Sequence, residues 1–101
     1  MALLRLNKSH MLPVIWLESA LDDVVRITQY IAQRNPQAAR NLSQRLIEDA
    51  ETLGAQSIYY RQGRVAGTHE YVSHPNYIIV YRRTLASVEV LSVLHSRQEY
   101  P

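Results

Sequence analysis

The chain has 101 residues, a formal net charge of +2 and no cysteine. This length suits a single domain that buries roughly 60–65% of its unfolded surface without disulfides or metal ions to staple it. The lack of cysteine excludes disulfides and thiolate metal sites and fits a reducing cytosol, and no apolar run approaches the ~20 residues that a membrane span needs.

The basic side chains are almost all arginine, since Lys8 is the only lysine. Arginine makes flat, bidentate contacts with carboxylates and phosphates, so an acidic protein or a nucleic acid is the kind of partner that this composition favours. A net charge of +2 is too small to require either.

Residues 1–11 are predicted to be a leader outside the fold. They lack the long apolar centre of a signal peptide and show no helical or strand period. Met11 directly precedes the first strand-like segment, which makes it a second candidate for the initiator. The domain is therefore predicted to span residues 12–101.

A short strand and a helix are predicted first. Residues 12–17 are apolar at successive positions, which is typical of a strand buried on both faces. Ser19 is predicted to cap the helix that follows, with Asp22 completing a pair like a capping box. The apolar residues of this helix fall on one stripe: Leu21, Val24, Val25, Thr28, Ile31 and Ala32.

A second helix is predicted immediately after the first. Asn35 is expected to be its N-cap, Pro36 its first residue and Gly54 the residue just past its end. Its apolar stripe consists of Ala39, Leu42, Leu46, Ile47, Ala50 and Leu53. Because almost no loop separates the two helices, they are predicted to form a compact helical hairpin.

Residues 55–67 show neither period and are predicted to form a surface loop. Tyr59 and Tyr60 stand beside Arg61 and Arg64, a combination that suits stacking on a nucleic acid. The same aromatic residues suit a second role, which is to cover an edge of the core.

Three strands are predicted in the last third, at residues 68–73, 77–83 and 88–95. The turn at 74–76 and the link at 84–87 are short, which favours an antiparallel meander. The run from Tyr77 to Tyr81 is the most apolar of the chain and is predicted to be a central strand. The predicted fold is α+β, in the order β-α-α-β-β-β, with the helical hairpin on one face of a mainly antiparallel sheet.

No metal or cofactor site is predicted, because the four histidines show no zinc-binding spacing and no glycine-rich phosphate loop is present. A metal-free ribonuclease would need a base, an acid and a cation that stabilises the phosphorane. His74 or His95, together with Arg97 and Tyr100, supplies these residue types near strand ends. The alternative is that His95 ends a strand while Arg97 and Tyr100 pack the C-terminus.

Five segments taken in order resemble the RelE/ParE superfamily of bacterial toxins from type II toxin–antitoxin modules. They are WLESA (16–20), NPQAA (35–39), RVAGTHE (64–70), HPNYIIVYR (74–82) and VLHSRQEYP (93–101). The resemblance covers nearly all of residues 12–101 and implies the same fold as the element order.

Within the superfamily the chain resembles the ParE branch. The branch that resembles RelE, whose members are ribosome-dependent ribonucleases, is expected to carry lysines on the second strand and an arginine early in the third. This chain has His69, Tyr71 and Ile78 at the corresponding positions. Arg97 does match the arginine that follows the last strand. The ParE-like branch is implied to bind DNA gyrase without chemistry of its own. The alternatives are a RelE-type ribosome-dependent mRNA endonuclease and a non-toxic binding module.

The resemblance also implies a cognate antitoxin, which lays an extended or helical segment over an apolar and arginine-rich surface in a hetero-oligomer. The predicted contacts to target or antitoxin are Arg61, Arg64, Arg82, Arg83, Arg97 and Tyr100.

Overall fold

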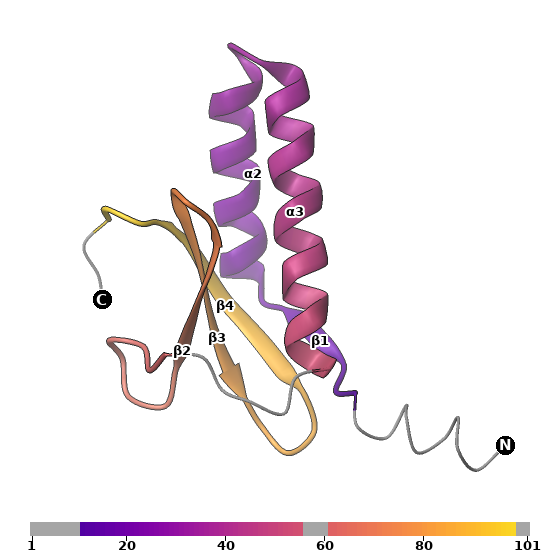
Figure 1. The fold of residues 1–101 in the computed structure, drawn as a ribbon, viewed down its shortest axis with the longest axis vertical. Helices are drawn as coiled ribbons and strands as arrows, with labels where there is room; N and C mark the ends of the chain where they lie inside the picture. The colour runs from indigo at the N-terminus through magenta and orange to yellow at the C-terminus, as the bar shows by residue number, and fades with distance from the viewer. Residues whose placement is uncertain (1–10, 56–60, 99–101) are drawn as a thin grey trace, which may run out of the picture.

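The computed structural model describes residues 11–55 and 61–98. Strand β1 (Val14–Trp16) leads into helices α2 (Glu18–Ala32) and α3 (Pro36–Ala55), and strands β2 (His69–His74), β3 (Tyr77–Arg83) and β4 (Val88–His95) follow. The helices form a hairpin that stands beside the sheet and extends well past one end of it (Figure 1). The predicted α+β fold is confirmed, while the leader residues 1–10, Tyr59, Tyr60 and Tyr100 lie outside the described residues.

The sheet has the strand order β1-β4-β3-β2. The last three strands form the predicted antiparallel meander, and β1 joins the edge by pairing parallel to β4. Strand β3 lies inside the sheet, and its residues Ile78, Ile79, Val80 and Tyr81 are all buried. The predicted central strand is therefore confirmed.

Strand β1 is shorter and more exposed than predicted. It has three residues, and the side chain of Ile15 is 46% exposed, so the prediction of a strand buried on both faces is wrong. Val14 and Trp16 pack against the core on the helix side, whereas Ile15 points to the other face of an edge strand. An all-apolar segment gives no sign of which face a tertiary neighbour will cover.

The start of α2 also differs from the prediction. Leu17 occupies the N-cap position without a side-chain cap, and the Ser19 hydroxyl instead donates to the Leu91 carbonyl at 2.7 Å. The Asp23 carboxylate, not Asp22, accepts a bond from the Val93 amide at 2.9 Å. These polar side chains fasten α2 to β4 rather than capping the helix.

The start of α3 agrees with the prediction. The Asn35 side-chain oxygen accepts a hydrogen bond from the Ala38 amide at 3.0 Å, and Pro36 is the first helical residue. Asn35 is thus the N-cap, which supplies a partner for one of the amides that a helix leaves unbonded in its first turn.

Gly54 lies inside α3, so its prediction as the residue past the helix end is wrong. The Leu12 amide donates to the Gly54 carbonyl at 2.8 Å, and a Cβ on Gly54 would lie 2.2 Å from the Leu12 carbonyl oxygen. Glycine is needed here because the chain entering β1 crosses the helix in direct backbone contact.

The main core lies between the hairpin and the sheet. Its buried residues are Ala20, Leu42, Leu46, Ala50, Leu53, Ile79, Tyr81, Val88, Val90 and Val93. The α3 stripe is buried as predicted except for Ile47, which is 48% exposed. The α2 stripe is only partly buried, because Leu21 and Val25 are each 50% exposed.

A second, smaller cluster lies on the opposite side of the sheet and contains Ile78, Val80 and Leu94. We call this side the outer face, because the helices cover the other one. Among the described residues, no helix has the length and the apolar character that a membrane crossing requires.

Candidate functional site

The two histidines named for the ribonuclease alternative lie at the same end of the sheet, with Tyr77 between them. Tyr77 is paired with His95 across the β3–β4 ladder. Its ring centroid is 5.8 Å from that of His74 and 5.4 Å from that of His95. The turn between β2 and β3 therefore brings together three rings from three strands.

Both histidines also bind nearby backbone. The Asn76 amide donates to Nδ1 of His74, and the Arg97 amide donates to Nδ1 of His95, each at 3.1 Å. These bonds stabilise the turn before β3 and the turn after β4. His95 therefore stabilises the end of β4, as the structural alternative for this residue predicts.

A cleft of about 310 Å³ opens beside His95, between α2 and this end of the sheet. We call it the His95 cleft; it is lined by Arg26, Ile27, Tyr30, Tyr77, His95 and Gln98. Arg97 is exposed and does not line the cleft, and Tyr100 lies outside the described residues. Of the described residues named for the ribonuclease alternative, the cleft holds only His95.

Tyr77, Arg26 and Tyr30 are cleft residues that the sequence reasoning missed. The signal for Tyr77 was present, because a short turn at 75–76 places it beside His74. No signal identifies Arg26 and Tyr30, since their approach depends on how α2 packs on the sheet.

The positions that correspond to the cationic residues of the nuclease branch do not form a common site. Tyr71 packs against the main core on the helix side, and the His69 ring lies 5.5 Å from that of Tyr81. Ile78 is 3% exposed in the cluster of the outer face. Two of these side chains therefore serve packing, on opposite sides of the sheet. Within residues 11–55 and 61–98, no group of three histidine or carboxylate side chains is placed to hold a metal ion.

Three of the predicted contact arginines form ion pairs. Arg61 and Arg64 approach Glu70, which is only 4% exposed, at 2.9 and 4.0 Å. Arg82 donates through Nε to Glu89 at 2.9 Å. Because neighbours of Glu70, Arg82 and Glu89 in their strands face the core, these three side chains project from the outer face.

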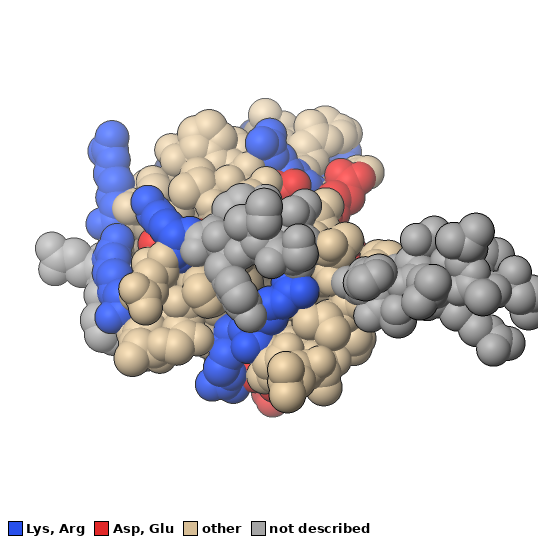
Figure 2. All heavy atoms as spheres, turned by 60° about the horizontal axis from the view of Figure 1, so that its bottom comes forward, with Lys and Arg blue, Asp and Glu red and all other residues tan. Residues whose placement is uncertain are grey.

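Arg83 and Arg97 lie elsewhere. Arg83 donates to the Leu53 carbonyl at 3.1 Å, near the end of α3, where a cation suits the negative end of the helix dipole. Arg97 follows β4 in the turn beyond His95. Figure 2 shows arginine side chains in several separate groups at one end of the molecule, with fewer Asp and Glu. Among the described residues, the predicted contact arginines lie at several different places on the sheet.

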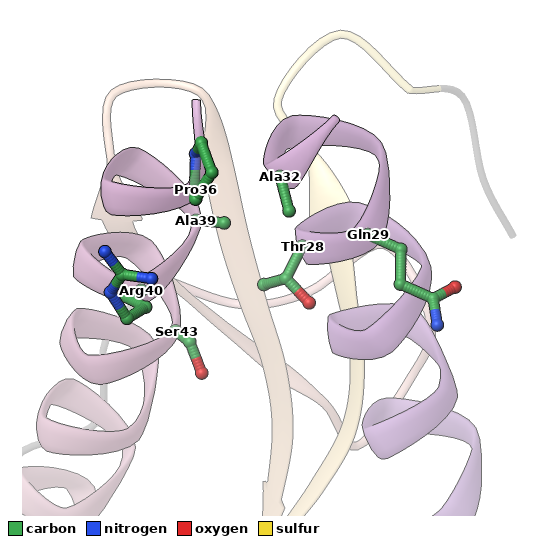
Figure 3. Close-up of a pocket in the computed structure, with 7 residues that line it drawn as sticks. All are labelled: Thr28, Gln29, Ala32, Pro36, Ala39, Arg40 and Ser43. Atoms are coloured by element: carbon green, nitrogen blue, oxygen red, sulfur yellow. The ribbon is translucent and has the colours of Figure 1, made fainter. Parts of the chain in front are cut away.

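The hairpin carries three adjoining hollows. The first lies near the link between the helices, where Thr28 and Ala32 point towards Ala39 and Ser43 (Figure 3). The second shares Ser43 and Arg40 with the first, and the third shares Ile47 with the second. The third is almost entirely apolar and reaches Trp16, Leu21, Val24 and Glu51.

We call these hollows together the hairpin groove. Its tip is the end at Ala32 and Pro36, and its base is the end at Trp16. Leu21 and Ile47 line it, and each is about half exposed, so apolar surface is left uncovered there. Such a face is typical of a site that binds another protein.

A family model described as the ParE toxin of the type II toxin–antitoxin system parDE matches residues 14–100. The chain belongs to the ParE toxin family. This membership confirms the predicted resemblance to the RelE/ParE superfamily and identifies the chain as a type II toxin of that kind.

Two relatives are also named as toxins, and a solved structure shares the fold. The chain is 33% identical over 87 residues to a protein named "Putative toxin Y4kP" of Sinorhizobium fredii, covering 85% of this chain and 90% of that one. It is also 33% identical over 88 residues to "Toxin RelE2" of Caulobacter vibrioides, covering 85% and 97%. A solved chromosomal ParDE system from P. aeruginosa shares the fold, with a TM-score of 0.76 at 19% identity, over 85% of this chain and 97% of that one.

Proposed function

We propose that this ParE-family toxin arrests growth by binding DNA gyrase and blocking its cycle, without cleaving a nucleic acid. The observation that carries the proposal is the burial of Ile78 and the packing of Tyr71 at positions where the nuclease branch is implied to keep cations. Stabilising the charge of the transition state is usually the largest part of such catalysis, and apolar packing supplies none of it. Because gyrase works in the bacterial cytoplasm, a toxin with this target acts there too.

A supercoiling assay with purified gyrase and the full chain tests this function. Loss of supercoiling with increasing toxin is the expected result. Undisturbed supercoiling at high toxin excess is the result that excludes gyrase as the target. An unrelated topoisomerase serves as the control for non-specific binding of a basic protein to DNA.

We further propose that a cognate antitoxin neutralises the toxin in a hetero-oligomer by placing a helical segment in the hairpin groove. A groove between two helices with exposed apolar residues suits the apolar face of a third helix. Co-expression with the neighbouring reading frame should relieve growth arrest and yield a complex that copurifies. A neighbouring protein that leaves growth arrest unchanged is not the antitoxin.

A second candidate function is ribosome-dependent mRNA cleavage. The observation that favours it is the His95 cleft, where an imidazole, a phenol and the guanidinium of Arg26 line one hollow. These groups are the types that RNA cleavage without a metal requires. If this function holds, primer extension after induction reveals cleavage sites in mRNA, and His95→Ala or Arg26→Ala removes them. If growth arrest occurs without such cleavage sites, the ribonuclease function is excluded and the gyrase proposal stands.

A third candidate is a binding module with the toxin fold and no toxicity. Growth arrest after induction of the full chain excludes it.

A further inference from the structure

Charged residues of the helical hairpin are segregated along its length. In chain order, the acidic residues of α2 precede its arginine, whereas the arginines of α3 precede its acidic residues. Because the two helices run in opposite directions, all six acidic residues lie towards the base, and the arginines lie towards the tip. The acidic residues are Glu18, Asp22, Asp23, Glu48, Asp49 and Glu51; the arginines are Arg26, Arg34, Arg40 and Arg45.

The charge order of α3 opposes its own helix dipole. This helix has no acidic residue in its first turn and no basic residue in its last. A helix is stabilised by the reverse arrangement, with acids near its N-terminus and cations near its C-terminus. The stability of α3 therefore does not explain the pattern.

The charges at the groove remain available to a partner. Arg40 lines the tip half, Glu48 the middle and Glu51 the base. Within residues 11–55 and 61–98, no ion pair joins any of these three to an opposite charge, whereas Asp23 and Asp49 pair with Arg26 and Arg45. The groove thus carries a cation in its tip half and carboxylates at its middle and base.

We infer that the hairpin groove binds a single amphipathic helix whose N-terminal half is acidic and whose C-terminal half is basic, running from tip to base. This inference rests on the proposed antitoxin and states the chemistry of its docking segment. The stretch of α3 from Pro36 to Glu51 rises by about 22 Å, which matches a helix of roughly 15 residues. A helix with this charge order also satisfies its own dipole, so the docking segment is favoured both alone and bound.

The shape of the groove adds to this description. At the tip the lining residues Ala32, Ala39 and Ser43 are small, so bulky apolar side chains of the partner fit there. At the base, Leu21 and Ile47 are half exposed and take up space in the groove, so smaller apolar side chains of the partner fit there. A second copy of the chain is a poorer occupant, because two concave grooves facing each other leave both unfilled.

Two synthetic peptides test the charge order with the full-length toxin. Both have 18 residues, the same composition and the same leucine and alanine positions; one has glutamates before lysines and the other has lysines before glutamates. The first should bind about tenfold more tightly at low ionic strength, and added salt should reduce the ratio.

A charge-inverted toxin removes the effect of differing peptide helicity. The triple variant Arg40→Glu, Glu48→Arg, Glu51→Arg should prefer the second peptide, because helicity is a property of the peptide alone. Ile47→Asp should weaken both peptides about tenfold, whereas Leu85→Asp, at a fully exposed apolar residue outside the groove, should weaken neither.

Several outcomes overturn the inference. Equal ratios for the wild-type and inverted toxins show that charge order plays no part, and binding of neither peptide shows that the groove takes no helix. Self-association of the toxin that Ile47→Asp abolishes shows that a second copy is the occupant. If the toxin arrests growth but binds both peptides equally, only this inference is wrong. If it prefers the first peptide but does not arrest growth, only the proposed toxin function is wrong.

Discussion

Gly54 lies in the last turn of α3, where replacing glycine by alanine ordinarily stabilises a helix by about 1 kcal/mol. Here the sign should reverse, because the new Cβ would meet the Leu12 carbonyl oxygen at 2.2 Å and push the start of β1 away. We expect Gly54→Ala to lower the free energy of unfolding by about 1–3 kcal/mol, the usual cost of overpacking. Urea denaturation followed by circular dichroism measures this.

Gly67→Ala is the control for that prediction. Gly67 has φ +82° and no atom within 4 Å of the position of a Cβ, so its cost comes only from backbone strain, about 1–2 kcal/mol. An unfolding free energy for Gly54→Ala at or above that of the wild type would show that helix propensity outweighs the contact with Leu12.

Residues whose partners lie nearby in the sequence were predicted correctly, and residues with distant partners were not. Asn35 was predicted correctly as an N-cap because its partner, the Ala38 amide, is three residues away. Ser19 and Gly54 were predicted wrongly because their partners are Leu91 and Leu12, which lie 72 and 42 residues away. A local pattern contains the first kind of information and not the second.

At the scale of elements, Glu70 fastens the segment before β2 to the outer face of the sheet. Its side chain is 4% exposed, and its carboxylate forms an ion pair with the Arg61 guanidinium at 2.9 Å. Its backbone amide donates a hydrogen bond to the Arg61 carbonyl. Glu70→Gln should lower the free energy of unfolding by about 1–3 kcal/mol, since a buried charge-assisted contact is weakened and a guanidinium loses its counter-charge. Thermal and urea unfolding measure the loss.

Glu89→Gln provides the matched control on the neighbouring part of the sheet. Glu89 pairs with Arg82, but the two side chains are 25% and 50% exposed, so solvent screens the pair and its loss should cost less than about 1 kcal/mol. Equal costs for the two variants would mean that burial of Glu70 adds nothing to its ion pair.

The prediction of whole elements succeeded where one element determines its own pattern. The run from Tyr77 to Tyr81 reads as a buried central strand because apolar side chains occupy both of its faces, and it is one. Strand β1 was predicted too long and too buried, since nothing in residues 12–17 says that they lie at a sheet edge. The stripe of α2 was correct in period and wrong in burial, because Leu21 and Val25 face outwards rather than into the core.

For the whole molecule, the sequence predicted the family and the order of elements but not where the surfaces lie. The arginines that it selected for binding turn out to lie on the outer face and near both ends of the sheet. The hairpin groove was not predicted as a site, because it depends on two helices leaving Ile47 and Leu21 uncovered. Only the relative placement of elements creates a surface of this kind.

The separation of these two surfaces predicts that toxicity and neutralisation can be uncoupled. The hairpin groove belongs to the helices, while Arg82 projects from the sheet face that the helices do not cover. Ile47→Asp should weaken antitoxin binding by about tenfold or more, because it places a charge in an apolar contact, and leave gyrase inhibition unchanged. Arg82→Ala should weaken gyrase inhibition by about tenfold and leave antitoxin affinity unchanged.

Calorimetric titration with the antitoxin and the supercoiling assay measure the two effects on the same protein samples. Both sites are about half exposed, so neither change should prevent folding, and the fully exposed Leu85→Asp controls for an added surface charge. If each variant lost both activities in proportion, target and antitoxin would share one surface, and neutralisation would be direct competition. Independent losses would instead mean that the antitoxin acts across the fold, by covering gyrase-binding residues with a further segment or by blocking access in the assembled complex.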